Sequence, residues 1–155
     1  MPALHNSVIA YKQNAISEML HSYELVHAIN PHAESPDDLI YKNIFPYFRV
    51  PTADTETLTY VTICIDFPET YHPENLMRQI VIKFCVIVHQ DQMETEYGCS
   101  RLDYISAKID DIFADHVGYG YGKLRLLQSN ESSLDQFHRY REMMFVSQEA
   151  QVTDC

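Results

Sequence analysis

Hydrophobic residues recur along the first part of the chain with the spacing of a helix. Between Ser7 and Ile29 they return every three or four positions, a spacing that lines one helix face. Asn30-Pro31 follows, and a residue before proline avoids the helical conformation. We therefore predict an N-terminal helix over about residues 7–29, with Ser7 as its N-cap. The residues of its apolar face are Val8, Ile9, Ile16, Met19, Leu20, Tyr23 and Val26.

Two strand-like segments come next. Leu58–Phe67 alternates, with Val61, Ile63 and Ile65 on one side, which predicts a strand with one buried face. Gln79–His89 is apolar on both sides, so we expect it at the centre of the sheet. The connection between these segments is long enough for an antiparallel pair with an extended hairpin tip.

A second helix and two further strands complete the pattern. Ser100–Asp103 resembles a capping box, and the apolar stripe after it predicts a helix over Leu102–His116. Lys123–Gln128 and Phe137–Val146 read as strands, separated by a polar turn at Ser129–Ser133. The fold class expected is α+β, with a four-stranded, mainly antiparallel sheet, one helix packed on it and the N-terminal helix, in the order α-β-β-α-β-β.

The remaining segments fit around this core in a single domain over residues 1–155. Residues 30–57 form a linker and an extended loop, residues 58–146 the α+β core, and residues 147–155 a C-terminal tail. Within the loop, Tyr41–Pro51 is aromatic and bounded by prolines, and we expect Phe45 and Phe48 to anchor it to the core.

The glycine-rich run Gly118–Gly122 is interpreted as a helix C-cap. A phosphate-binding loop follows a strand and opens a helix, whereas these glycines follow a helix and enter a strand. We therefore expect a helix terminus here, with Tyr119 and Tyr121 on the surface.

The charge balance argues against nucleic-acid binding. With 22 acidic and 11 basic side chains, the formal net charge is −11, and a field of that sign repels phosphates. Acidic composition keeps a protein soluble, and it would also suit a surface past which DNA slides. The longest apolar run, Ile80–Val88, is interrupted by Lys83 and is far shorter than the roughly 20 residues that span a bilayer. The first residues lack the pattern of a signal peptide, so we expect a soluble protein made in the cytosol, without a membrane partner.

The sequence contains no constellation typical of an enzyme, a metal site or a cofactor site. Glu24–His27 and Glu69–His72 both have the ExxH spacing, but the second lies in a turn between prolines, where a di-iron site cannot form. His89 and His138 are interpreted as ordinary strand-end histidines. We predict no catalytic, cofactor-binding or metal-binding residue.

The cysteines are expected to be reduced. A bridge between Cys64 and Cys85, on neighbouring strands, is the alternative. Cys99 is the one candidate for a reactive thiol, because it precedes a helix and lies near Arg101, but no base is predicted beside it.

Aromatic and arginine side chains on loops and strand ends suggest contacts with other proteins, since these types are enriched at interfaces. Loops carry such contacts more often than regular elements do. The predicted interface residues are Tyr47, Phe48, Arg49, Glu69, Tyr71, His72, Arg139 and Arg141.

With these elements in place, the chain resembles the neck or tail-completion proteins of tailed bacteriophages, most closely the tail terminator family. Its order of helices and strands is similar to theirs over nearly the whole chain. The strings Asp38–Pro46, Ser100–Asp103 and His138–Arg141 also resemble small phage proteins of this kind from Gram-positive hosts.

The resemblance implies a structural virion protein, made in the host bacterial cytoplasm and located in the neck. It implies a homohexameric ring that caps the tail tube, contacts the tail-tube protein and the head-tail connector or stopper protein, and leaves a lumen for DNA. The family brings no catalytic residues to this chain.

Three readings stay open at this stage. The first is a tail terminator or another neck protein, such as a stopper or a head-tail adaptor. The second is a phage-encoded protein-binding adaptor that works as a monomer or dimer. The third is an enzyme whose site would gather Cys85, His89 and His138.

Overall fold

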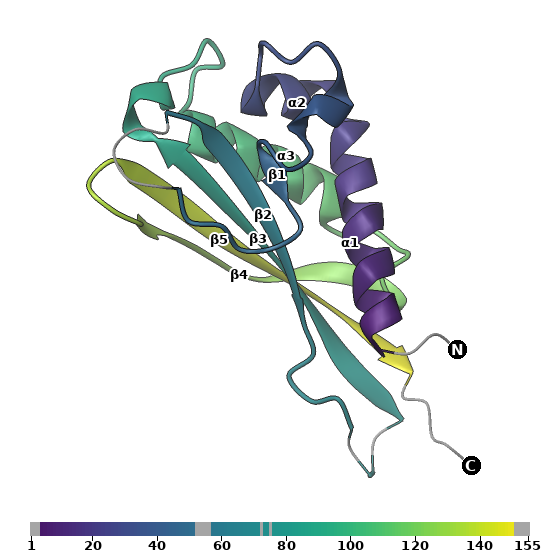
Figure 1. Ribbon diagram of the computed structural model, residues 1–155. Coiled ribbons are helices and arrows are strands. Elements are labelled where there is room, and N and C mark those ends of the chain that lie inside the picture. Colours follow the sequence, from purple (N-terminus) through teal and green to yellow (C-terminus); the bar gives the residue numbers. More distant parts are fainter. Residues whose placement is uncertain (1–3, 52–56, 72, 75, 151–155) are drawn as a thin grey trace.

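The two strand-like segments of the first half pair as predicted. In a computed structural model, which describes residues 4–51, 57–71, 73–74 and 76–150, β2 (Thr59–Asp66) and β3 (Met77–His89) are antiparallel. β3 also pairs with β5 (His138–Ala150), so it lies in the middle of the sheet, as its two apolar faces predict. β4 (Tyr121–Ser133) pairs with β5 at one edge (Figure 1).

A fifth strand, which the sequence analysis assigned to a loop, lies at the opposite edge. β1 (Ile44–Phe45) runs parallel to β2, and the sheet order is β1-β2-β3-β5-β4. The sheet is therefore five-stranded and mixed, and the prediction of four antiparallel strands is wrong in this detail. Asn43 connects the strands, because its carbonyl accepts the Val61 N–H at 2.7 Å and its side-chain amide donates to the Thr59 carbonyl at 2.9 Å. The sequence analysis missed β1 because a strand of two residues is too short to show an alternation of apolar and polar positions.

The last two strands are longer than predicted. β4 continues through the polar residues 129–133, which the sequence analysis assigned to a turn. Both faces of this edge strand are largely exposed, so backbone pairing with β5 holds it without any alternation of apolar residues. β5 extends through residues 147–150, at the start of the predicted tail, and residues 151–155 lie outside the described residues.

The predicted N-terminal helix is two helices. α1 (Leu4–Leu20) and α2 (Tyr23–Ile29) are separated by a break, at which the Ser22 hydroxyl accepts the Leu25 N–H and caps α2. Ser7 is not a cap, since it is buried inside α1. A 3₁₀ turn, η1 (Pro36–Leu39), follows.

The second predicted helix is confirmed as α3 (Arg101–Phe113), which ends three residues earlier than expected. The Ser100 hydroxyl accepts the Asp103 N–H at 3.1 Å, as the capping pattern indicated. A short 3₁₀ turn, η3 (Gln90–Gln92), lies between β3 and α3.

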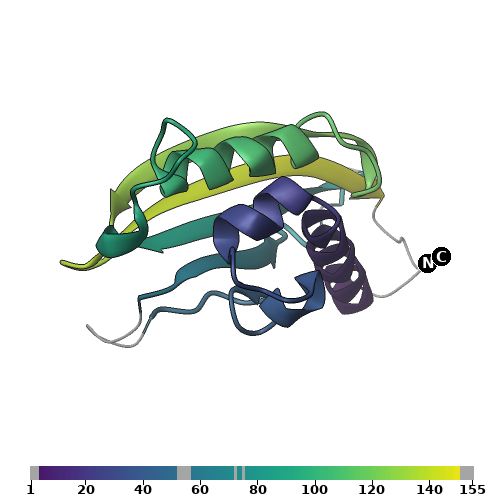
Figure 2. The same cartoon turned by 90° about the horizontal axis from the view of Figure 1, so that it is seen from above.

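The helices pack on one face of the sheet and enclose the main core (Figure 2). Ile63, Phe84 and Phe145 of the sheet meet Ile109 and Phe113 of α3 in this core. A smaller cluster of Phe45, Tyr60, Cys85 and Ile87 lies apart from it. Phe45 thus anchors its segment as predicted, whereas Phe48 is 50% exposed and does not. No helix in the described part of the chain has the length and apolar content needed to cross a bilayer.

The glycine-rich run differs from the predicted C-cap. α3 ends at Phe113, and Asp115 already takes a left-handed conformation, with φ 59°, before the first of these glycines. Tyr119 is buried rather than on the surface, with its hydroxyl 3.2 Å from a carboxylate oxygen of Glu18. Tyr121 is 62% exposed, as expected.

Candidate protein-binding surfaces

An apolar groove of about 770 Å³ lies between α1 and the segment Pro36–Pro46. Ile9, Ile16 and Leu20 contribute to its α1 wall, while Ile40 and Tyr41 belong to the opposite wall. Ile9 is 54% exposed and Tyr41 is 65% exposed, so large apolar side chains meet solvent here. We call this feature the α1 groove.

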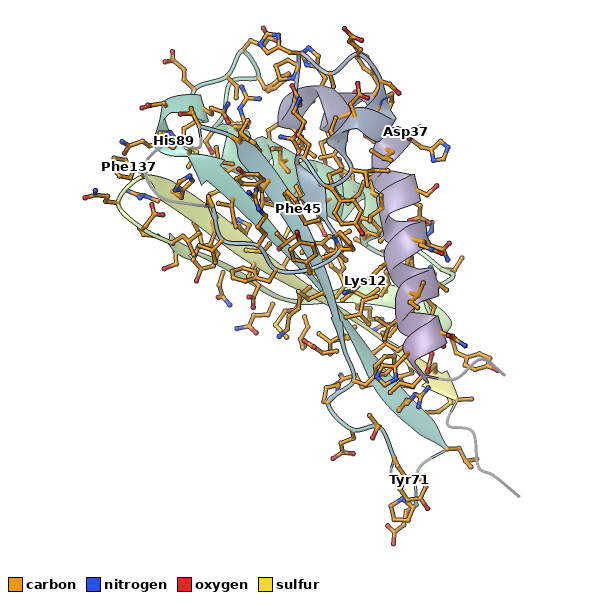
Figure 3. All side chains as sticks on the ribbon, in the orientation of Figure 1. Lys12, Asp37, Phe45, Tyr71, His89 and Phe137 are labelled. Atoms are coloured by element: carbon orange, nitrogen blue, oxygen red, sulfur yellow. The ribbon has the colours of Figure 1, made fainter. Side chains whose placement is uncertain are left out.

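Contacts between its walls hold the α1 groove in shape. The Lys12 ammonium donates to the Pro46 carbonyl at 2.6 Å, which ties α1 to the end of β1. In the opposite wall, the Ser35 N–H donates to the Asp38 carboxylate and Leu39 is fully buried. The exposed Ile40 and Tyr41 therefore extend from a segment that is itself fixed to the core. Lys12 and Asp37 mark the groove in Figure 3.

The sequence analysis missed this groove because it placed Ile9 and Tyr23 on the same apolar face as Met19. Ala15 and Met19 are fully buried, whereas Ile9 and Tyr23 are 54% and 79% exposed, so that expectation is wrong for these two. The available signal was the number of apolar positions in α1, which exceeds what one buried stripe requires.

The connection between β2 and β3 forms a second exposed surface. β2 pairs with β3 only from Val81 onward, so the hairpin reaches away from the body of the protein (Figure 1). Tyr71 is 66% exposed at its far end (Figure 3), and Leu76 is 74% exposed. We call the described residues 68–71, 73–74 and 76 the hairpin tip. Glu69 is exposed there, and His72, another predicted interface residue, lies outside the described residues.

A buried charged network anchors the base of this hairpin. The Arg78 guanidinium donates to the Glu149 carboxylate, with Nε 2.7 Å from Oε1, and lies 5.0 Å from the centre of the Phe67 ring. The Tyr11 hydroxyl donates to the other Glu149 oxygen at 2.8 Å. Burial, followed by this hydrogen bond and the Glu149 charge, raises the pKa of Tyr11 to about 12. The network joins α1, β3 and β5 beneath the hairpin.

The predicted interface segment Tyr47–Arg49 lies next to the α1 groove. The Tyr47 ring is 6.5 Å from the Tyr41 ring, which belongs to the groove wall. Tyr47 and Phe48 are 47% and 50% exposed. The Arg49 guanidinium lies over the rings of Phe45 and Tyr60, at 4.8 and 5.0 Å from their centres. Arg49 therefore also packs against the smaller core cluster.

The two predicted interface arginines of β5 make contacts within the chain. Arg141 bonds to the Ser129 hydroxyl at 3.0 Å and lies 3.4 Å from a carboxylate oxygen of Glu131. Arg139 donates to the backbone carbonyl of Asp135 at 3.2 Å. Both side chains are half-buried, and their role in an interface stays a prediction.

The enzyme alternative requires Cys85, His89 and His138 at one site, and the structure brings the two histidines close together. The rings of His89 and His138 are 5.0 Å apart, and His138 Nδ1 lies 3.0 Å from the Asp135 carboxylate. Asp135 also accepts the N–H of His138, so this pair stabilises the β4–β5 turn. His89 Nδ1 accepts the Asp91 N–H at 3.0 Å. Within the described residues, no three His, Cys, Asp or Glu side chains gather as a metal-binding group.

The cysteines within the described residues are free thiols. Cys85 is opposite Thr62 and Cys64 is opposite Lys83 in the β2–β3 register, so the alternative Cys64–Cys85 bridge is not formed. Burial, reinforced by the charge of Glu142, raises the pKa of the Cys85 thiol to about 12, which keeps it protonated at neutral pH. Cys99 is exposed.

Comparison with known proteins gives one family match. The YomW family model matches residues 8–146. None of the curated proteins matches the chain. Among solved structures, one chain of the "Virion of native gene transfer agent (GTA) particle" is 16% identical, and the match covers 82% of this chain and 98% of that one. Its TM-score is 0.44, so we draw no functional argument from it.

Proposed function

The chain belongs to the YomW family, and from that premise and its sequence resemblance to phage neck proteins we propose that it is a structural virion protein of a tailed bacteriophage. Within the virion we propose a tail-terminator-like role in the neck. The protein would be made in the host bacterial cytoplasm and then incorporated at the junction of tail and head.

In this role, six copies form a ring that caps the tail tube and joins it to the head-tail connector or stopper protein. The observation that carries this proposal is the presence of two separate exposed apolar surfaces, the α1 groove and the hairpin tip. A ring subunit contacts its two neighbours through different surfaces, and two distinct sites on one chain meet that requirement.

The charge of the chain supports a lumen through which DNA passes. A formal net charge of −11 repels the phosphate backbone, so DNA would move through the ring without binding to its wall. A positively charged lumen would retain the DNA instead.

We propose that the protein acts by binding other proteins and not by catalysis. His138 and Asp135 form hydrogen bonds that stabilise the β4–β5 turn, and His89 accepts the Asp91 N–H at the start of η3. Alanine at His89 or His138 should therefore leave a neck function intact if the fold survives, and would abolish an enzyme that used them.

The native mass of the protein tests the ring. It should be measured by light scattering over a range of concentrations, alone and with the tail-tube protein of the same phage. A mass of six subunits in either condition supports the proposal. A persistent monomer or dimer in both conditions contradicts it and favours the protein-binding adaptor.

Phage particles provide a second test, which addresses the position in the virion. A phage that lacks this protein should produce filled heads and separate tails, and the purified protein should restore their joining. Joined, infectious particles in its absence would contradict a neck role.

A further inference from the structure

We propose that the hairpin tip of one copy binds in the α1 groove of the next copy, so that the copies associate head to tail. Only one part of this inference rests on the proposed function, namely that the ring closes at six copies. The contact itself is argued from the two surfaces alone.

Both surfaces expose large apolar side chains that a single chain leaves uncovered. On the hairpin tip these are Tyr71 and Leu76, and on the groove they include Ile9 and Tyr41. Isolated exposed apolar residues are common, but clustered ones mark sites of binding. A head-to-tail contact covers both sets at once.

The size of the groove suits this occupant. Its volume of about 770 Å³ lies within the roughly 300–1,000 Å³ of pockets that enclose small ligands. Such a space accepts a few side chains of a narrow hairpin, which is what Tyr71 and Leu76 offer.

The charges of the two surfaces favour the same pairing. The hairpin tip contains Glu69 and Glu74, and the sequence from 68 to 76 has no lysine or arginine. On the α1 wall of the groove the charged residue is Lys12, whereas the opposite segment, Pro36–Pro46, contains Asp37 and Asp38 as well as Lys42. Because two copies with a net charge of −11 repel each other over most of their surface, an orientation that brings the acidic tip to Lys12 is favoured over one that brings it to Asp37.

The two surfaces cannot meet within one chain. The hairpin tip lies at the far end of the sheet, whereas the groove lies beside the middle of α1, as Tyr71 and Lys12 show in Figure 3. Each copy therefore offers one tip and one groove, which is a heterologous contact that forms rings or filaments. The Arg78–Glu149–Tyr11 network fixes the hairpin base to α1 and β5.

Two variants and a matched control test the contact. The tip variant combines Tyr71→Ser with Leu76→Ser, and the groove variant combines Ile9→Glu with Ile40→Glu. The control combines Tyr23→Ser with Leu127→Ser, which remove side chains of the same types that are 79% and 61% exposed elsewhere. Circular dichroism and melting temperature establish that each variant folds.

Light scattering over a concentration series measures self-association. The tip and groove variants should each weaken association by about 30-fold or more, the size typical of losing central interface residues. The control should change it by less than about 3-fold. Equal association by all three variants and the wild type overturns the inference, and so does a wild-type chain that remains monomeric.

Mixing the two variants separates a head-to-tail contact from a symmetric one. The tip variant retains its groove and the groove variant retains its tip, so an equal mixture should form one-to-one dimers and nothing larger. In a symmetric contact, tip would bind tip or groove would bind groove. Mixing the two variants would then produce no dimers beyond those that each variant forms alone, and the inference would fail.

The outcomes also separate this inference from the proposed function. Rings that form on the tail tube equally well with the tip and groove variants contradict the inference alone. Normal head-tail joining without the protein, combined with head-to-tail association in solution, contradicts the function alone.

Discussion

Glu149 illustrates how a single residue holds distant elements together. Its side chain is 10% exposed and contacts Arg78 of β3 and Tyr11 of α1. The guanidinium of Arg78 is equally buried, so each charge depends on the other. Removing one partner of such a pair leaves an uncompensated charge, which costs far more than losing an exposed pair.

We expect Glu149→Gln to destabilise the protein by about 3–5 kcal/mol, because it strands the buried guanidinium of Arg78. Asp66→Asn is the matched control, since it removes an exposed ion pair with Lys83 and should cost at most about 1 kcal/mol. Urea unfolding of both variants measures the difference. Equal costs would mean that the buried pair contributes no more than the exposed one.

Tyr11 gives the network a pH dependence. Its pKa is about 12 in the folded protein and about 10 in an unfolded chain, so the folded state holds the proton more tightly. The stability it contributes is complete below pH 10 and is lost as the pH rises from 10 through 12. The urea midpoint of the wild type should therefore fall more steeply over this range than that of Tyr11→Phe. If the urea midpoints of the two proteins fell equally with pH, the raised pKa of Tyr11 would be contradicted.

At the scale of elements, α3 and the start of β4 differ in what determines them. Residues of α3 and its cap determine the helix, whereas the start of β4 depends on a distant part of the chain. α3 has its cap, its apolar stripe and its buried residues in one continuous segment. β4 instead begins next to Gly120, where an added Cβ would lie 2.2 Å from the Gln148 carbonyl oxygen. That close approach involves β5, 28 residues later in the chain.

Ile109→Asp should abolish cooperative unfolding, because it places a charge in the core beneath α3, where Ile109 is fully buried. Ala107→Asp, on an exposed position of the same helix, is the control and should leave a folded protein. Circular dichroism during heating distinguishes them. A folded Ile109→Asp variant would show that α3 does not pack as described.

Gly120→Ala should destabilise the protein by about 2–4 kcal/mol, since its φ of 77° and its contact with Gln148 both exclude a side chain. Gly122→Ala shares the left-handed conformation, with φ 82°, but has open space around it. It should cost only about 1 kcal/mol. Chemical denaturation measures the free energy of unfolding of both variants. The difference between the two losses is the cost of the steric contact with Gln148.

At the scale of the whole molecule, exposed apolar residues are unevenly distributed. Several lie at the α1 groove, in the adjoining segment Tyr47–Arg49 and on the hairpin tip, and a further group lies on β4. The groove extends the interface expected from sequence, because Tyr47 adjoins its wall.

Replacing both Tyr47 and Phe48 by serine should weaken ring assembly and leave the melting temperature nearly unchanged, because both side chains are about half exposed. Arg49→Ala should instead lower stability by about 1 kcal/mol, since its guanidinium packs on Phe45 and Tyr60. Native mass and thermal melting measure the two effects separately. Normal assembly of the double variant would show that this segment is not an interface.

Much of the candidate site lay beyond sequence reasoning. The aromatic residues Tyr47 and Tyr71 could be selected by type and are exposed, but their relation to the α1 groove could not. The groove joins residues 9–20 of α1 and His21 after it to residues 36–46 of a later segment, and neither segment alone indicates that they face each other. Leu76, among the most exposed large apolar residues described, has no distinguishing local pattern.

The sequence by itself determined β2, the central position of β3 and the capped helix α3, because their signals are periodicities and caps within one segment. Only the tertiary structure decided the parallel pairing of β1, the break between α1 and α2, and the burial of Tyr119. Each of these depends on a contact with a distant part of the chain. Such contacts leave no periodic trace, since a residue's partners are chosen by packing and not by its neighbours in sequence.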